Sequence, residues 1–198
     1  MKAKYFSFAT LMVLAMIILT PSVSYGQTKF GIRGGLNASN ISFDNLPNRG
    51  ERYGFHLGIF TEVPLVPDFM SLQPELSYSV KGTSYKPASV SQKLNMSYVD
   101  LLLPVAFKLS SIDIQVGPFA SFLISTPDYT VFNENRVVVD AFKKFDAGLT
   151  AGLSYNFSKI MIGLRYNQGF VDVTNDNARV LLGGGKNAVG QVSLGYKF

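Results

Sequence analysis

The 198-residue chain has no cysteine and no tryptophan, and His56 is its single histidine. Without cysteine it can have no disulfide scaffold, zinc-thiolate site, cysteine nucleophile or lipid-modified N-terminal cysteine. Charge is also scarce, because only 16% of residues are charged whereas 47% are hydrophobic. This composition excludes a disordered chain and indicates a membrane protein or an apolar secreted protein. The net charge of +5 is small and scattered, so nucleic acid is not an expected partner.

The N-terminal segment has the organisation of a signal peptide. Lys2 and Lys4 precede an uncharged apolar stretch, which Pro21 ends, and Ser24-Tyr25-Gly26 offers small residues for cleavage before Gln27. A retained membrane anchor is the alternative, but the stretch is shorter than the roughly 20 residues that a membrane-spanning helix needs. We predict a signal peptide over residues 1–26 and one domain over 27–198.

Long hydrophobic runs are absent from the rest of the chain. The longest, Leu101 to Phe107, is interrupted by Pro104. Hydrophobicity instead alternates with a period of two, as in Leu72, Pro74, Leu76, Tyr78 and Val80, which are separated by polar residues. This period is typical of β-strands with one apolar and one polar face.

The alternation predicts eight strands, near residues 29–39, 53–63, 71–82, 95–108, 112–125, 144–155, 159–169 and 188–198. The connections at 64–70, 109–111 and 156–158 are short, whereas those at 40–52, 83–94, 126–143 and 170–187 are long and polar. Bacterial outer-membrane barrels have an even number of strands, short periplasmic turns and long extracellular loops. The predicted fold is therefore all-β, an eight-stranded antiparallel up-and-down transmembrane β-barrel in the outer membrane.

A secreted lipocalin-like barrel is the soluble alternative, with its apolar side chains inside rather than outside. The polar face decides between them, because it combines many glycines with charges of both signs. Such a face suits a narrow, self-neutralising lumen better than a solvated surface. The expected lumenal charges are Arg33, Glu62, Glu75, Lys81, Asp100, Asp113, Asp146 and Arg165.

The last strand places Val192, Leu194, Tyr196 and the terminal Phe198 on one face. This ending resembles the signal that the barrel assembly machinery recognises. Phe198 is also compatible with one more lipid-facing side chain, but its place at the end of the chain favours the signal. We expect the assembly machinery and outer-membrane lipid as partners.

Five segments together resemble the PorT-like outer-membrane β-barrel family of Bacteroidota, and they occur in the family's order. They are Phe30 to Ile41, Leu72 to Gly82, Tyr98 to Pro104, Gly117 to Phe119 and Arg165 to Phe170. The resemblance accounts for Pro74, Pro104 and Pro118 inside strands, where each removes a ladder donor, so we expect a bulge or a missing hydrogen bond at each. Asp100 stands where the family usually has glutamate.

No pattern in the chain makes a convincing catalytic, cofactor or metal site. His56 could serve a Ser-His-Asp hydrolase, but we expect a lumenal histidine that is hydrogen-bonded to a carboxylate. The lumenal carboxylates are better explained as ion pairs than as acid–base pairs. Gly183-Gly184-Gly185-Lys186 lacks the spacing of a phosphate loop. The expected interfacial aromatic girdles include Tyr53, Tyr78, Tyr155, Tyr166 and Tyr196.

These observations leave functions of different classes open. The first is a non-enzymatic barrel that acts as an envelope structural component or, as the resemblance implies, as an accessory of a type IX-like secretion complex. The second is transport or binding of a small ligand, and the third is an outer-membrane enzyme. A general diffusion pore is disfavoured, because eight strands enclose little more than their own side chains.

Overall fold

The computed structural model describes residues 28–43, 49–85, 92–125, 143–175 and 184–198. Within these residues no helix is long and apolar enough to cross a membrane. The strands are β1 (Lys29–Phe43), β2 (Arg49–Gly50), β3 (Arg52–Val66), β4 (Met70–Leu72), β5 (Glu75–Tyr85), β6 (Gln92–Leu102), β7 (Val105–Leu109), β8 (Ile112–Ser125), β9 (Phe145–Phe157), β10 (Ile160–Gly169) and β11 (Gly185–Lys197). The predicted signal peptide, residues 1–26, lies outside the described residues.

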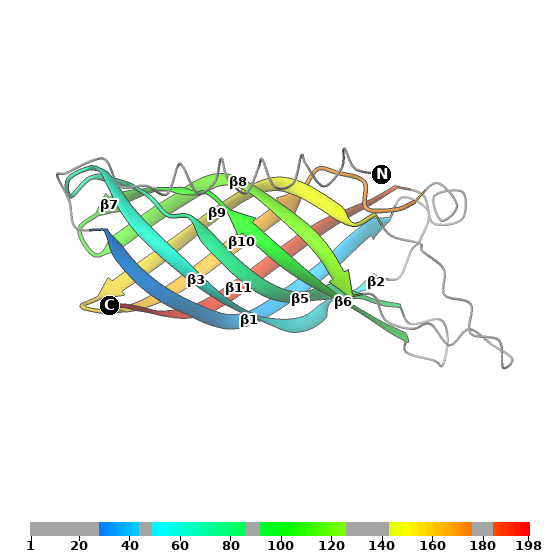
Figure 1. Cartoon of the computed structure of the whole chain (residues 1–198). Helices are drawn as coiled ribbons and strands as arrows, with labels where there is room; N and C mark the ends of the chain where they lie inside the picture. Colours follow the sequence, from blue (N-terminus) through cyan, green and yellow to red (C-terminus); the bar gives the residue numbers. More distant parts are fainter. Residues whose placement is uncertain (1–27, 44–48, 86–91, 126–142, 176–183) are drawn as a thin grey trace, which may run out of the picture.

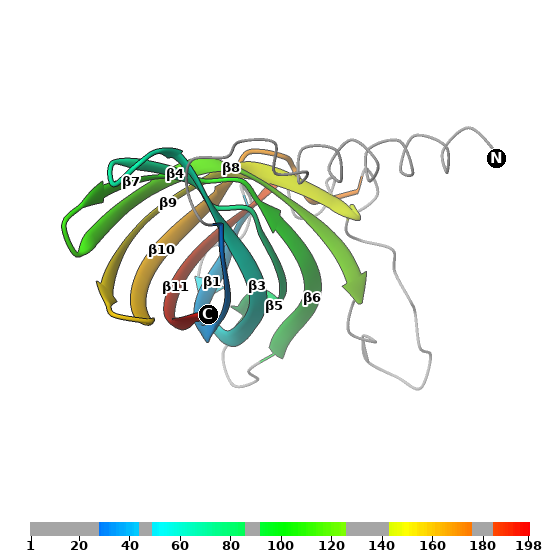
Figure 2. The same ribbon diagram turned by 60° about the vertical axis from the view of Figure 1, so that its left-hand side comes forward.

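The described strands close into a single antiparallel barrel (Figures 1 and 2). Three of its strands are each formed by two consecutive segments: β2 with β3, β4 with β5, and β6 with β7. Pairing of β8 with β9 and of β3 with β5 continues the ring, and β1 pairs with β11 from Gly31↔Lys197 to Phe43↔Gly185. Counted in this way, the described part of the chain forms the predicted eight-stranded up-and-down ring.

Alternation along each strand separates an apolar outer wall from a polar lumen. The outward side chains include Leu36, Leu57 and Leu194, and these three are 61–69% exposed. The eight charged side chains expected in the lumen are all buried, with Arg165 the most exposed of them at 8%. A soluble barrel would have the opposite arrangement, so the wall is built to contact hydrocarbon and the lipocalin alternative is rejected.

The two ends of the barrel differ. Three short connections lie at one end, called here the turn end, and Asp68, Ser110 and Ser158 adopt left-handed backbone conformations there, with φ of 55° to 58°. Lys29 begins β1 at the same end, and the Phe198 N–H donates to the Phe30 carbonyl at 2.9 Å (Figure 1, left). The strand ends that flank the four connections expected to be long lie at the opposite, loop end. Much of each connection falls outside the described residues, at 44–48, 86–91, 126–142 and 176–183.

The three prolines expected to disturb the sheet each lose one hydrogen bond. Their carbonyls accept from the facing strand, Thr61 N–H to Pro74 at 2.9 Å, Gln73 N–H to Pro104 at 2.8 Å and Leu103 N–H to Pro118 at 3.0 Å. No proline can donate the reciprocal bond. The strands are interrupted at Pro74 and Pro104, whereas β8 continues through Pro118. The shifts in register lie elsewhere, between Pro64 and Val66 and between Ser97 and Tyr98.

A glycine makes room for one of these prolines. A Cβ on Gly117 would lie 2.4 Å from the Leu103 carbonyl oxygen and 2.5 Å from the Pro104 Cα. These are distances that real Cβ atoms do not tolerate, so Gly117 permits the close approach of β8 to the interrupted strand. The proline and the glycine act together to keep the wall continuous.

Candidate functional site

The lumen is the candidate site, and its charges form three groups along the barrel. The lower group lies near the turn end and is centred on Glu62 of β3. The Lys108 Nζ is 2.5 Å from Glu62 Oε1, and the Lys197 Nζ is 2.8 Å from Glu62 Oε2. Lys197 also lies 4.0 Å from Asp113 of β8. Two lysines therefore face two carboxylates, and this group is neutral.

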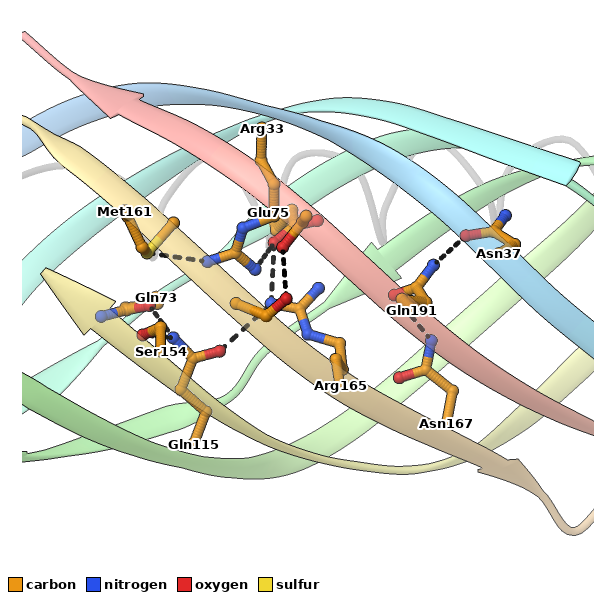
Figure 3. A network of polar contacts seen from close by, with 12 residues as sticks. Arg33, Asn37, Gln73, Glu75, Gln115, Ser154, Met161, Arg165, Asn167 and Gln191 are labelled. Atoms are coloured by element: carbon orange, nitrogen blue, oxygen red, sulfur yellow. Dashed lines mark hydrogen bonds and ion pairs between the residues drawn. The ribbon is translucent and has the colours of Figure 1, made fainter.

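The middle group is centred on Glu75, whose carboxylate is 2% exposed (Figure 3). Its Oε2 accepts from Arg33 Nη1 at 2.6 Å and from Arg165 Nη2 at 3.0 Å. Arg165 also donates to Gln115 Oε1 at 3.2 Å, and Gln115 donates to Gln73 Oε1 at 3.0 Å. Because two guanidinium groups share one carboxylate, this group has an excess of one positive charge.

The upper group lies nearer the loop end and contains Lys81, Asp100 and Asp146. Lys81 Nζ donates to Asp100 Oδ1 at 2.8 Å and to Ser121 Oγ at 3.0 Å. The ammonium also lies 4.9 Å from the centre of the Tyr98 ring, a distance at which cation–π attraction operates. Asp146 is fully buried and has no ion pair within the described residues. This group therefore has an excess of one negative charge.

His56 does not have the carboxylate partner that the sequence suggested, and that expectation is wrong. Its Nδ1 lies 2.7 Å from Asn37 Oδ1, while Glu62 is occupied by two lysines. Asn37 also accepts from Gln191 at 3.0 Å and donates to Ser79 Oγ at 3.0 Å. An amide can donate and accept at once, so Asn37 joins groups on three strands as a carboxylate could not.

Residues 171–174 follow β10 and continue its place in the wall, between the segment before β9 and the start of β11. Val173 N–H donates to the Gly185 carbonyl at 2.8 Å, and Lys143 N–H donates to the Val173 carbonyl at 2.7 Å. Asp172 Oδ1 accepts from the N–H of Thr174 at 3.0 Å and of Gly185 at 2.9 Å. Val173 and Thr174 are fully buried. Fully or almost fully buried apolar side chains also point inward from the strands in this half of the barrel: Ile41, Met96, Tyr98 and Val189.

The sequence analysis missed two lumenal lysines, Lys108 and Lys197. With them, five basic side chains balance the five carboxylates that were expected. Alternation could have identified both, because Lys108 shares the parity of the inward Ala106, and Lys197 shares that of the inward Ser193. Their positions at the ends of strands made them resemble solvated terminal residues.

The geometry of the lumen does not resemble a catalytic centre. Ser79 lies directly across from His56 in the β3–β5 ladder, but its Oγ bonds to Asn37 and the residue is fully buried. His56 Nε2 has no hydrogen-bond partner among the described residues, so the contact between nucleophile and base is not made there. No three acidic or histidine side chains of the described residues converge as metal ligands. Gly185 and Lys186 belong to β11, whereas Gly183 lies outside the described residues.

The five tyrosines expected in girdles all point outward and are 38–67% exposed. Tyr155 and Tyr196 lie near the turn end and Tyr53 lies near the loop end, whereas Tyr78 and Tyr166 are within their strands. The terminal Phe198 is 67% exposed, and its ring centre is 5.4 Å from that of Tyr196. The wall thus has aromatic side chains at both ends.

Comparisons with known proteins agree with this architecture. No curated protein matches the chain. Among solved structures, neisserial surface protein A is 13% identical with a TM-score of 0.51, and 87% of this chain aligns with 100% of that protein. Ail of Yersinia pestis, in complex with the heparin analogue sucrose octasulfate, is 14% identical with a TM-score of 0.50 over the same shares. Identities this low show a common fold and nothing finer.

The sequence profile of the outer membrane protein β-barrel domain matches residues 22–175, which is most of the chain. The matched region extends from before β1 to the segment that follows β10, and β11 completes the same ring. The apolar outer wall, the charge-paired lumen and this match lead to one conclusion: the chain belongs to the outer membrane protein β-barrel domain family and is located in the outer membrane.

Proposed function

We propose that the protein is a closed, non-enzymatic barrel that serves the outer membrane as a structural component or as an accessory of a secretion complex. The observation that carries this proposal is the contact between Arg165 and Glu75. Arg165 is on β10 and Glu75 is on β5, and three strands separate them in either direction around the ring. Two side chains therefore meet across the full width of the lumen, and this contact supports a closed barrel.

The occupied lumen argues against transport of a small ligand, the second candidate. Polar side chains on both sides of Glu75 along the barrel are also hydrogen-bonded to one another, as in the Lys81–Asp100 and Gln191–Asn37 contacts. A function that does not use the lumen must use the outer wall or the loops. In barrels of this kind the short turns face the periplasm, so we assign the loop end to the cell exterior.

Planar-bilayer recording on the protein purified from outer membranes tests the closed state. We expect no conductance steps from the wild-type barrel. The Arg33→Ala/Arg165→Ala variant removes both side chains that reach Glu75 and should conduct if it still inserts. Discrete steps from wild-type protein, at the level of a water-filled pore, would overturn the proposal in favour of transport.

The secretion role rests on the resemblance to the PorT-like family, which has a member in the type IX system. A deletion strain tests it by comparing the proteins released into the medium with those retained in the periplasm. Retention of secreted proteins in the deletion strain, with restoration by the wild-type gene, supports an accessory role. Normal secretion together with increased leakage of periplasmic proteins would instead indicate an envelope structural role.

A further inference from the structure

A groove crosses the outer wall of the barrel from β8 to β3. It encloses about 800 Å³, and the atoms that line it are almost all apolar. It lies between two adjacent rows of outward side chains, and the backbone of the inward row that contains Gln191 and Arg165 forms its floor. Its lining among the described residues is confined to these three rows, so the groove opens to the lipid side of the wall. We call it the wall groove.

Small residues in the row nearer the loop end open the wall groove. Ala38 of β1 pairs with Gly190 of β11, and Ala151 of β9 belongs to the same row. Among the described residues, a Cβ on Gly190 would meet only the Ala38 carbonyl oxygen, at 3.8 Å, so the space outside Gly190 is open. The row nearer the turn end has larger aliphatic side chains, from Leu36 on β1 to Ile114 on β8. In full, the row nearer the loop end is Tyr53, Ala38, Gly190, Tyr166, Ala151 and Val116.

The wall groove runs obliquely from the loop end into the hydrocarbon region. Tyr53 follows Arg52, where β3 begins at the loop end, whereas Ile114 lies close to Ile112, where β8 begins at the turn end. Five steps between neighbouring strands, at about 4.8 Å each, make the groove roughly 24 Å long. Strands of such barrels tilt by about 35–45°, so this length descends by roughly 15 Å, which is half of a hydrocarbon core of about 30 Å. The groove therefore has the depth of one leaflet, the leaflet at the loop end.

Polar groups lie at the loop end of the wall groove. The Tyr53 hydroxyl donates to Glu51 Oε2 at 3.2 Å, toward the start of β3. The Tyr166 hydroxyl donates to Gln168 Oε1 at 3.0 Å, toward the end of β10. Lys186 is exposed on the outer face of β11, roughly 13 Å along the strand from the groove. A basic side chain at this height attracts the phosphate of an anionic lipid.

We propose that the wall groove holds one acyl chain of lipid A, the phosphorylated glycolipid of the outer leaflet, and that Lys186 contacts its phosphate. About 800 Å³ over roughly 24 Å gives a mean cross-section of roughly 33 Å², whereas a helix about 10 Å across needs about 80 Å². The groove therefore admits a hydrocarbon chain and not a partner helix. A chain that lies in it contacts protein on the floor and on both sides, so it gains more dispersion contacts than a chain on the convex wall. The choice of leaflet rests on the proposed function, which assigns the loop end to the cell exterior.

Native mass spectrometry of the tagged full-length protein, purified from outer membranes in a mild detergent, tests the proposal. We expect wild-type barrels to retain one lipid A molecule. Gly190→Ile should lose most of this lipid, because the new side chain fills the open space and suits a strand. Leu194→Phe enlarges an exposed side chain of the same strand outside the groove and should retain the lipid. A lipid-free wild type, or equal retention by these two variants, would overturn the proposal.

The exposed Lys186 allows a second test that does not alter the groove. Wild-type protein refolded into vesicles should retain phosphorylated lipid A several-fold better than dephosphorylated lipid A, and Lys186→Gln should retain both equally. No preference in the wild type would overturn the phosphate contact, and retention of phospholipid in place of lipid A would overturn the choice of lipid. The heat-modifiable gel shift shows that each variant is folded. Conductance and secretion, which test the proposed function, are measured without this lipid, so the two proposals can fail separately.

Discussion

Replacing Glu75 with glutamine should destabilise the barrel more than removing either arginine that binds it. Glu75→Gln keeps the size of the side chain but removes its charge, and this leaves two buried guanidinium groups without a carboxylate. Arg165→Met has a different effect. It removes one arginine while Arg33 stays paired with Glu75 at 2.6 Å, so the middle group becomes neutral.

The magnitudes follow from these contacts. Breaking a buried ion pair from one side costs about 3–5 kcal/mol, because the remaining charge is uncompensated. For Glu75→Gln we expect a loss in this range. Arg165→Met forfeits the hydrogen bonds to Glu75 and Gln115 but leaves the remaining pair of Arg33 and Glu75 neutral, so we expect about 1–3 kcal/mol. The matched control is Glu51→Gln, which makes the same substitution at an exposed position and should change stability by less than about 0.5 kcal/mol.

Urea unfolding of protein refolded into lipid vesicles gives these free energies. The chain has no tryptophan, so the transition must be followed by circular dichroism or by the gel shift of the folded barrel. The reasoning requires an order: Glu75→Gln below Arg165→Met, and Arg165→Met below Glu51→Gln. If Glu75→Gln is as stable as Arg165→Met, then the two arginines do not share a desolvated carboxylate and the charge assignment of the middle group is wrong.

Three further predictions concern the ends of the barrel. A cysteine at Asn135, in the segment between β8 and β9, should react with an impermeant thiol reagent on intact cells, whereas a cysteine at Ser110 should not. The opposite pattern would show that the loop end faces the periplasm. Deleting Phe198 should cost about 2–3 kcal/mol of apolar contact, so the protein should still refold in vitro. In cells the same deletion should deplete the protein from outer-membrane fractions. Wild-type levels in those fractions would refute the assembly signal. Ser158→Gly should raise the free energy of unfolding by about 0.5–1 kcal/mol, because Ser158 has φ of 55° and glycine adopts that conformation without a steric penalty; a loss of stability on urea unfolding would contradict this.

Alternation in the sequence determined the wall of the barrel. Because side chains on a strand point to opposite faces in turn, the parity of Arg33, Glu75 and Arg165 is enough to place all three in the lumen, where they are buried. The same parity would have placed Lys108 and Lys197 there. Lost ladder bonds at the three prolines were also predictable, since proline has no N–H whatever the fold around it.

Pairing within the lumen was decided only by the tertiary structure. The sequence shows which residues face inward but not their height or their neighbours, which depend on the register of every strand pair and on the closure of β1 against β11. His56 therefore contacts Asn37 rather than a carboxylate, and Glu75 receives an arginine from each of two strands that lie 42 and 90 residues away in the chain. Local periodicity determines the face that a side chain occupies, and ring closure determines its partners, because partners come from strands that only the closed barrel brings together.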